Sequence, residues 1–401
     1  MRKKEIVIVG AGPAGLSAAL TAAEAGAEVL LLNRFSRPGG QLVKQTHRFF
    51  GSEKEYAMTR GFEIAEILAE EMRKDPRIEF MTATALGLYS DRVLTVLKGE
   101  EYSKIKGDAF IIATGASEKF LAFENNDLPG IYGAGAVQTL MNVHGVRPGK
   151  RVLMVGSGNI GLIVSYQLLQ AGIEVAAVLE AAPKIGGYQV HAAKLLRLGV
   201  PIKTSRTIKK ALGTDRVEGA VSVGLDKDWN EIPGSEETYE VDAICIAVGL
   251  KPLAELAEMA GAEMLYVPEL GGKVPWRRRG FATTVPWVFV AGDASGIEEA
   301  SSAIIEGRLA GLEAASYLGK THPKHSELEE ELLKELEALQ LLFDCVTVQT
   351  SCLVVKDRQD RRPEHTVERP AGTDALVEFP FAIGHTPIVP APRHKSRAEL
   401  L

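Results

Sequence analysis

Cysteine is scarce in this chain of 401 residues, and the cysteines present are poorly placed for redox chemistry. Three occur, Cys245, Cys345 and Cys352, so none lies in the first 244 positions. A redox dithiol needs two sulfurs in a CxxC or CxxxxC arrangement, and an iron–sulfur cluster needs a full set of thiolates. The sequence therefore excludes a dithiol relay before Cys245 and argues against an iron–sulfur cluster bound by this chain alone. Cys245 falls in the apolar run 243–248, which is typical of a buried structural thiol.

Long apolar runs and excess positive charge are also missing. No apolar run approaches the roughly 18 residues of a membrane-spanning helix, and the formal net charge of −6 argues against nucleic acid or an anionic membrane as a partner. The basic start at Met1–Lys4 resembles the first part of a signal peptide, but the apolar stretch after it runs into a glycine-rich turn. We therefore expect a cytoplasmic protein without membrane insertion or a metal site, with a length that fits two or three domains.

What the chain does contain is one strand–turn–helix pattern, present twice. Apolar residues 6–9 lead into GAGPAG at 10–15, and residues 152–155 lead into GSGNIG at 156–161. In a GxGxxG turn the first glycine makes the bend, the second lets the backbone approach a pyrophosphate, and the third allows close helix–strand packing. The phosphates then meet the N–H groups and positive dipole of the helix start. Two such turns predict two dinucleotide sites, with electrons passing between them.

The two halves repeat beyond the glycines, which predicts an α/β fold with two Rossmann-like dinucleotide-binding domains. The strand after each turn ends at a polar residue, Asn33 in the first half and Glu180 in the second. Each half then closes on an apolar strand that runs into Gly115 or Gly249, and we expect the second domain to be inserted in the first at these points. The expected limits are residues 1–118 and 250–320 for the discontinuous first domain, 119–249 for the inserted domain, and 321–401 for a helical extension and an irregular tail.

Several segments lie outside the repeat. An amphipathic pattern at 53–73 and small residues at about 298–318 each predict a helix. Residues 327–342 predict a charge-rich helix whose leucine stripe docks on the body or on a partner, and the cluster Arg277–Arg279 is expected on a solvated face, with docking of an acidic partner as the alternative. From about Asp357 the sequence is rich in Pro, Arg and His without periodicity, so we expect 357–401 to be poorly ordered. The stripe consists of Leu328, Leu332, Leu336 and Leu339.

Five motifs, in this order along the chain, resemble the pyridine nucleotide–disulfide oxidoreductase superfamily, which are FAD enzymes with two dinucleotide-binding domains. The resemblance covers about residues 4–319. Within the superfamily, Arg37–Leu42 and the lack of cysteine there resemble the FAD/NAD-type subunits of opine oxidase, hydrogen cyanide synthase, dye-linked proline dehydrogenase and heteromeric sarcosine oxidase, and proteins that accompany glycerol-3-phosphate dehydrogenases. The motifs are Gly10–Gly15, Gly39–Gln41, Ala113–Gly115, Gly156–Gly161 and Ala291–Asp293.

The resemblance implies that the first turn holds the FAD pyrophosphate. Asn33 stands where an acidic residue usually binds the adenosine ribose, and an amide can still hydrogen-bond a hydroxyl. Asp293 would face the ribityl or phosphate end, and the helix that begins at about 297–302 would point its N-terminal amides at the flavin, where negative charge builds on reduction. In the alternative interpretation, Asp293 is the N-cap of that helix.

Glu180 favours NAD over NADP at the second turn. It ends the second strand, 19 residues after Gly161, where an acidic side chain bonds the ribose 2′-OH and repels a 2′-phosphate. The residues expected to contact the two dinucleotides are Gly10, Gly12, Pro13, Ala14, Gly15, Asn33, Arg34, Gly40, Gln41, Thr114, Gly115, Gly156, Gly158, Asn159, Ile160, Gly161, Glu180, Gly249, Gly292 and Asp293.

Segment 41–52 takes the place where one subfamily keeps its cysteines, so we expect it over the flavin. Gln45, Thr46 and His47 are the candidate catalytic residues there, and His47 is expected to titrate near neutral pH. The predicted function is hydride transfer between NAD(H) and FAD, with electrons exchanged with a non-thiol small molecule or protein. We expect one subunit of a heteromeric amine, imino-acid or glycerol-3-phosphate dehydrogenase, or a homo-oligomer. The alternatives are a stand-alone NADH:quinone, dye or oxygen oxidoreductase and a non-catalytic nucleotide-binding scaffold.

Overall fold

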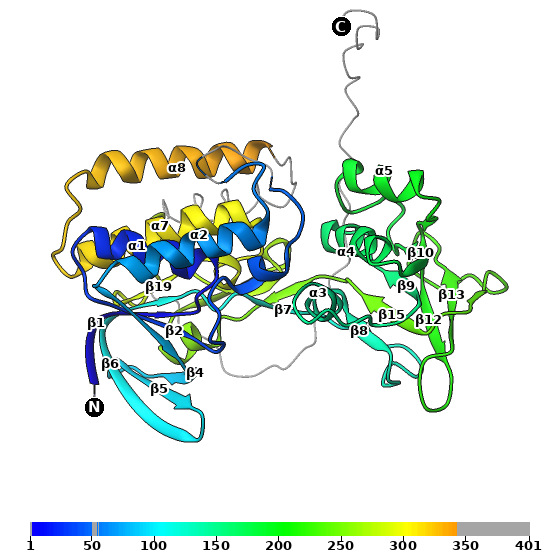
Figure 1. Ribbon diagram of the computed structural model, residues 1–401, viewed down its shortest axis with the longest axis horizontal. Helices are drawn as coiled ribbons and strands as arrows, with labels where there is room; N and C mark the ends of the chain where they lie inside the picture. The colour runs from blue at the N-terminus through cyan, green and yellow to red at the C-terminus, as the bar shows by residue number, and fades with distance from the viewer. Residues whose placement is uncertain (1, 50–53, 55, 343–401) are drawn as a thin grey trace, which may run out of the picture. The chain divides into compact units, whose positions relative to one another are not determined.

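The computed structural model describes residues 2–49, 54 and 56–342, which form a mixed α/β fold with two largely separate β-sheets (Figure 1). The first sheet has seven strands. Strands β1, β2, β3, β6 and β19 pair in parallel, and β4 and β5 extend the sheet in antiparallel fashion. In sheet order the strands are β3 (Ile78–Thr82), β2 (Val29–Asn33), β1 (Arg2–Val9), β6 (Glu101–Ile112), β5 (Val93–Lys98) and β4 (Thr84–Leu88), with β19 (Val288–Val290) also paired to β6.

The second sheet has five strands, all paired in parallel. A separate three-stranded antiparallel sheet lies between the last two strands of this sheet in the chain. The five strands, in sheet order, are β11 (Ile202–Lys203), β10 (Glu174–Leu179), β9 (Arg151–Val155), β15 (Ala243–Ile246) and β8 (Ile131–Gly133), and the antiparallel sheet consists of β12 (Arg206–Leu212), β13 (Gly219–Gly224) and β14 (Glu237–Tyr239).

The two sheets are built on the same plan around one central strand. β1 lies between β2 and β6, and β9 lies between β10 and β15. Ile6 pairs with Val29 in the first sheet as Val152 pairs with Val175 in the second. Continuous apolar strands of this kind are buried on both faces, as parallel sheets require. In such folds ligands bind outside the carboxyl ends of the strands, where the strand order reverses, and both glycine-rich turns lie at that point.

The connections between the sheets are two short strands that pair with each other. β7 (Ala116–Glu118) follows β6, and β16 (Leu250–Pro252) follows β15. They form an antiparallel two-stranded ribbon in which Lys251 pairs with Ser117. The chain therefore leaves the first sheet and returns to it through one ribbon (Figure 1), so the second sheet is inserted between strands of the first.

Helix α7 (Ala300–Tyr317) packs closely on α1 (Pro13–Glu24). A Cβ atom on Gly307 would lie 2.1 Å from the carbonyl oxygen of Ala14, and one on Gly311 would lie 2.4 Å from that of Ala18. These two glycines let the helix backbones approach each other. The other α-helices described before α8 are α2 (Gly61–Lys74), α3 (Ala134–Asn142), α4 (Asn159–Gln170), α5 (Gln189–Arg197) and α6 (Glu255–Met259). Strands β17 (Met264–Val267) and β18 (Gly272–Pro275) form an antiparallel hairpin.

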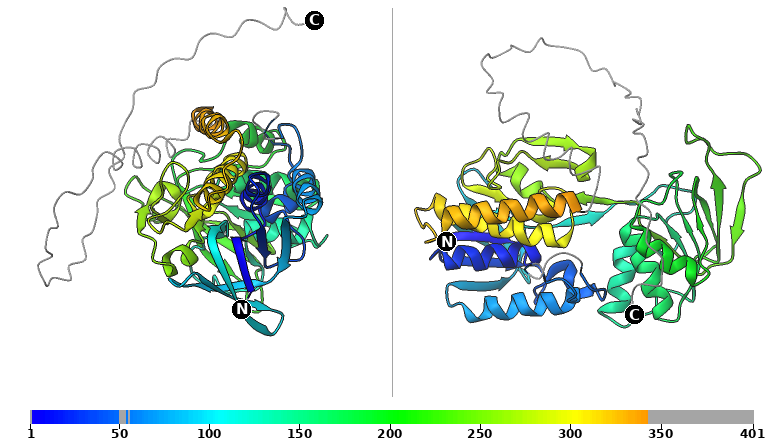
Figure 2. Two further views of the ribbon diagram at one scale, coloured as in Figure 1. Left: turned by 90° about the vertical axis from the view of Figure 1, so that its left-hand side faces the viewer. Right: turned by 90° about the horizontal axis from the view of Figure 1, so that it is seen from above.

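The leucine stripe predicted at 327–342 docks on the body of the protein. Helix α8 (His325–Leu342) runs along α7 (Figures 1 and 2), and Leu332, Leu336 and Leu339 are buried in the core that contains α1 and α7. Leu328 is partly buried against the same core. Of the two alternatives left open by the sequence, the contact with the body is the one observed.

One predicted helix begins later than expected. The pattern at 53–73 yields a helix only from Gly61, because Tyr56 and Met58 have φ angles of 62° and 66°, which a right-handed helix does not allow. The carboxylate of Glu63 accepts the backbone N–H of Arg60 at 2.9 Å and so fixes the helix start. The expected disorder at 357–401 lies outside the described residues. Among the helices described, none has the length and apolar character needed to cross a bilayer.

Candidate dinucleotide-binding site

The first glycine-rich turn has the geometry of a phosphate cradle. Gly10 has a φ of 107°, and a Cβ atom there would lie 2.2 Å from the carbonyl oxygen of Ala113. A Cβ on Gly15 would lie 1.8 Å from the carbonyl oxygen of Gly10, so strand, turn and helix approach too closely for any other residue. By contrast, a Cβ on Gly12 would come no closer than 3.9 Å to a neighbouring atom, which is Gly40 Cα. The start of α1 has no side-chain cap and no acidic residue in its first turn, which leaves its N–H groups for an anion.

The second turn repeats this arrangement. Gly156 has a φ of 106°, and its Cβ would lie 2.2 Å from the carbonyl oxygen of Ala247. A Cβ on Gly161 would lie 2.1 Å from the carbonyl oxygen of Gly156, whereas a Cβ on Gly158 would meet no described atom within 4 Å. Helix α4 also starts without a side-chain cap or an acidic first turn. Both turns therefore fit a pyrophosphate at the middle glycine.

The polar residues that end β2 and β10 bind the turns themselves. Asn33 Oδ1 accepts the Ala11 N–H at 3.3 Å, and Glu180 Oε2 accepts the Ser157 N–H at 2.9 Å and the Ser157 hydroxyl at 2.6 Å. Glu180 Oε1 accepts the Ala182 N–H at 2.9 Å. The carboxylate is thus held in place before any ligand arrives.

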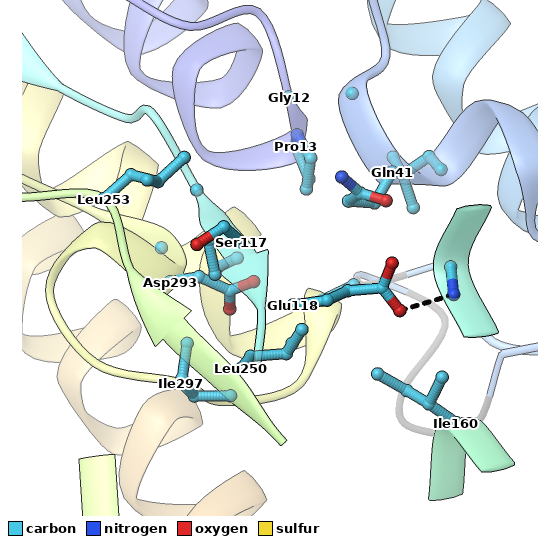
Figure 3. A pocket seen from close by; sticks show the side chains of 18 of the residues that line it. Gly12, Pro13, Gln41, Ser117, Glu118, Ile160, Leu250, Leu253, Asp293 and Ile297 are labelled. Atoms are coloured by element: carbon cyan, nitrogen blue, oxygen red, sulfur yellow. Dashed lines mark hydrogen bonds between the residues drawn. The ribbon is translucent and has the colours of Figure 1, made fainter. Parts of the chain in front are cut away.

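A single cavity of about 1870 Å³ brings most of the predicted residues together. Both glycine-rich turns line it. Figure 3 shows Asp293 at the same cavity as Gly12, Pro13 and Gln41. Three predicted residues, Gly15, Thr46 and Gly161, are not in its lining. The predicted residues that line it are Gly10, Gly12, Pro13, Ala14, Asn33, Arg34, Gly40, Gln41, Gln45, His47, Thr114, Gly115, Gly156, Gly158, Asn159, Ile160, Glu180, Gly249, Gly292 and Asp293.

Asp293 is not the N-cap of the following helix. It lies in the short 3₁₀ turn Gly292–Ala294, whereas α7 begins at Ala300 with Glu299 at its N-cap position. Burial raises the pKa of the Asp293 carboxyl to about 7, although it accepts the backbone N–H of Glu298. The alternative interpretation of Asp293 as a helix cap is therefore wrong, and its side chain is left facing the cavity.

The segment expected over the flavin supplies two polar side chains with buried, unsatisfied atoms. Within the described part of the chain, Gln45 Oε1 and His47 Nδ1 have no hydrogen-bond partner. Burial, with smaller contributions from His191 and Lys194, lowers the pKa of His47 to about 4, so the expectation that it titrates near neutral pH is wrong. Thr46 instead accepts a hydrogen bond from Gln167 Nε2 at 2.8 Å.

Sequence reasoning missed Lys44 and Glu118, which also line the cavity. Glu118, whose side chain points across the cavity in Figure 3, accepts the backbone N–H groups of Gly135 and Ala136 at 2.6 and 3.2 Å. Lys44 Nζ donates to the Gly135 carbonyl at 2.9 Å. Burial lowers the pKa of Lys44, and the charge of Glu118 partly opposes this. Both contacts join residues far apart in the chain, and neither residue stands in a motif, so the sequence held no signal for them.

The chain belongs to the pyridine nucleotide-disulphide oxidoreductase family, whose sequence model matches residues 4–307. Members of this family bind FAD and NAD(P). The two cradles fit these cofactors because each has a bare middle glycine and an uncapped helix start facing one cavity.

Curated relatives confirm the narrower resemblance. The chain is 29% identical over 280 residues to the alpha subunit of sarcosine oxidase from Rhizobium meliloti strain 1021, a match that covers 66% of this chain and 26% of the relative. It is 27% identical over 344 residues to an opine oxidase subunit of Rhizobium meliloti, covering 79% of this chain and 63% of the relative. The chain therefore matches about a quarter of the first relative and less than two thirds of the second.

Solved structures share the fold. The L-proline dehydrogenase of P. horikoshii superposes with a TM-score of 0.65 at 23% identity, over 83% of this chain and 59% of that chain. The thioredoxin reductase of T. acidophilum superposes with a TM-score of 0.65 at 22% identity, over 79% of this chain and 99% of that chain. At this level of identity the likeness establishes the two-domain Rossmann fold alone.

Proposed function

We propose that the protein is an FAD-dependent oxidoreductase that transfers a hydride between NAD(H) and its flavin. Bound FAD supplies a two-electron acceptor for the nicotinamide hydride. The observation that carries the proposal is the single cavity lined by both glycine-rich turns. Residues at the strand ends of two separate sheets would then hold the two dinucleotides in one cavity.

Each turn has a distinct task in this proposal. The first turn, with Gly40 and Gln41, holds the FAD pyrophosphate, and Asn33 meets the adenosine ribose. The second turn holds the NADH pyrophosphate, with Glu180 directed at the ribose 2′-OH. Because Glu180 is negatively charged and already fixed by Ser157, it disfavours a 2′-phosphate.

The second exchange of electrons at the flavin is with an acceptor or donor other than a thiol. No cysteine occurs before Cys245, and Cys245 is free and fully buried in β15. The segment over the cavity offers Gln45 and neutral His47 instead. These side chains can bind and orient a small molecule by hydrogen bonds, but His47 at neutral pH has no proton to give as an imidazolium.

The relatives support a role as one subunit of a heteromeric dehydrogenase. Two of them are named as subunits, of sarcosine oxidase and of opine oxidase. A partner subunit would oxidise an amine, imino acid or glycerol phosphate and pass two electrons to the flavin of this chain, and the flavin would return them as a hydride to NAD⁺.

Affinity purification of the tagged full chain from the cell that encodes it tests the subunit proposal. The expected result is a stoichiometric second flavoprotein and a complex that oxidises sarcosine, an opine, proline or glycerol 3-phosphate. If the chain purifies alone and turns over NADH with a quinone, a dye or oxygen, it is a stand-alone oxidoreductase and the subunit proposal is wrong.

A further inference from the structure

A buried carboxyl group lies directly behind the turn that presents Asp293. Glu306, in the second turn of α7, is 1% exposed. Its Oε2 accepts the backbone N–H of Gly292 at 2.7 Å and the hydroxyl of Ser295 at 2.9 Å. Both donors flank Asp293, so one carboxyl oxygen fixes the two ends of the Gly292–Ala294 turn.

The other carboxyl oxygen of Glu306 accepts no hydrogen bond from the turn. Among the described residues Glu306 Oε1 has no hydrogen-bond partner, and the nearest opposite charge is Arg277 Nη2 at 3.9 Å. Arg277 is itself largely buried and lies over the ring of Phe281, 4.3 Å from its centroid. This contact corrects the expectation of a solvated face for Arg277. A buried acid with an unused oxygen costs stability, which suggests that it is kept for its effect on the turn.

We propose that Glu306 is a positioning residue of the flavin site, which holds the Gly292–Ala294 turn so that Asp293 faces the cavity. It does not line the cavity itself, and it acts through Gly292 and Ser295. The inference rests on the proposed assignment of Asp293 and the first glycine-rich turn to FAD.

The surroundings of Glu306 determine when it carries charge. Burial, together with the negative charge of Glu298, raises its pKa to about 8, and Arg277 with the two donors opposes the shift. Asp293 and Glu299 are the other acids of the same loop, and α1, which packs on the same face, brings no titratable side chain before Glu24. Glu306 is therefore mostly neutral at pH 7 and becomes an anion, close to the FAD-binding turn, as pH rises through 8.

The experiment measures FAD affinity by flavin fluorescence after adding FAD to the apoprotein, as a function of pH. Glu306→Gln keeps an oxygen that accepts from Gly292 and Ser295, whereas Glu306→Leu leaves both donors unpaired in the interior. We expect the Leu variant to bind FAD about tenfold or more weakly and the Gln variant to stay within about threefold of the parent at pH 7. Above pH 8 the parent should lose affinity relative to the Gln variant. Glu313→Gln, on the same helix but paired with His325, is the control and should follow the parent.

Two results overturn the inference. One is a folded Leu variant with parental FAD affinity. The other is FAD affinity that changes with pH in the same way in the parent and the Gln variant from pH 7 to 9. This second result can be obtained even if the Leu variant does not fold. Gly12→Val separates this failure from failure of the proposed function. If that variant loses FAD while Glu306→Leu keeps it, only the role of Glu306 is wrong; if Gly12→Val keeps FAD, the assignment of the flavin site is wrong.

Discussion

The carboxylate of Glu180 is bound to Ser157 twice, through the backbone N–H at 2.9 Å and the hydroxyl at 2.6 Å. In the first half of the chain, Asn33 makes the corresponding single contact with the Ala11 N–H at 3.3 Å. The second site therefore has a fixed negative charge where the first has a neutral amide. A fixed negative charge at this position would disfavour a 2′-phosphate, whereas a neutral amide would not.

Nicotinamide preference should follow from this charge. We expect NADH to bind more tightly than NADPH, with an upper limit of about 4 kcal/mol for a unit charge at ~4 Å and an effective dielectric of ~20. Glu180→Gln should reduce the difference in affinity between NADH and NADPH, because it removes the charge and keeps an acceptor for Ser157. Glu180→Arg should narrow it further or invert it, although part of its effect comes from unpaired donors at Ser157 and Ala182. The measurement is the dissociation constant of each nucleotide, and equal affinities in the parent would remove Glu180 from this role.

Paired valine substitutions should separate the two nucleotide sites. A Cβ atom at Gly12 would come no closer than 3.9 Å to a described atom, and one at Gly158 would meet none within 4 Å, so we expect both variants to fold. Gly12→Val should lower FAD affinity by more than about tenfold, ~1.4 kcal/mol, because the side chain occupies the path of the pyrophosphate. Gly158→Val should keep its FAD and remain yellow, but its affinity for NADH should fall by a similar factor of more than about tenfold. Flavin content and nucleotide titration of each variant check the assignment, and the opposite pattern would exchange the two sites.

Cysteine replacement should leave the electron path intact. Burial raises the pKa of the Cys245 thiol far above its ordinary value, so no reactive thiolate forms at neutral pH. A variant with Cys245→Ala, Cys345→Ser and Cys352→Ser should therefore reduce its flavin with NADH at the parental rate, at a cost of about 1 kcal/mol in stability. Stopped-flow measurement at matched FAD content decides this. A large loss of rate in a folded, yellow variant would mean that a cysteine takes part.

Acid should destabilise the protein through His47. Its pKa is lowered from 6.5 to about 4 in the native state, so the unfolded chain binds more protons between these values. The stability contributed by neutral His47 is present above pH 6.5 and is lost as pH falls toward 4, with a cost of about 2 kcal/mol between pH 7 and pH 5. The free energy of unfolding should therefore fall more steeply with acid in the parent than in His47→Gln, which has no imidazole to protonate. A pH dependence that is identical in the two proteins would place the His47 pKa near its ordinary value.

The fold and the two glycine-rich cradles could be predicted because they depend on local sequence. Gly10 and Gly156 need a positive φ, and their turns follow buried strands, so the pattern alone identifies the two cradles. The late start of α2 could not be predicted, because the apolar periodicity gave no sign of the positive φ angles at Tyr56 and Met58.

The polar environment of the site was beyond sequence reasoning for a different reason. The pKa of His47 depends on residues from a distant part of the chain, and the contacts of Glu118 with Gly135 and of Glu306 with Gly292 depend on how neighbouring elements fold back on each other. Burial decides the charge of each group, and composition or spacing does not report burial for a lone polar residue.

Hydride transfer between nicotinamide and flavin is tested by anaerobic addition of NADH to the purified chain, followed through the visible absorbance of the flavin. We expect one equivalent of NADH to bleach the bound FAD of the parent, and NADPH to do so only at much higher concentration. The flavin of Gly158→Val should remain oxidised until dithionite is added. A parent protein that binds FAD and NADH but keeps its flavin oxidised until dithionite is added would contradict the account, because the two nucleotides would then serve only assembly.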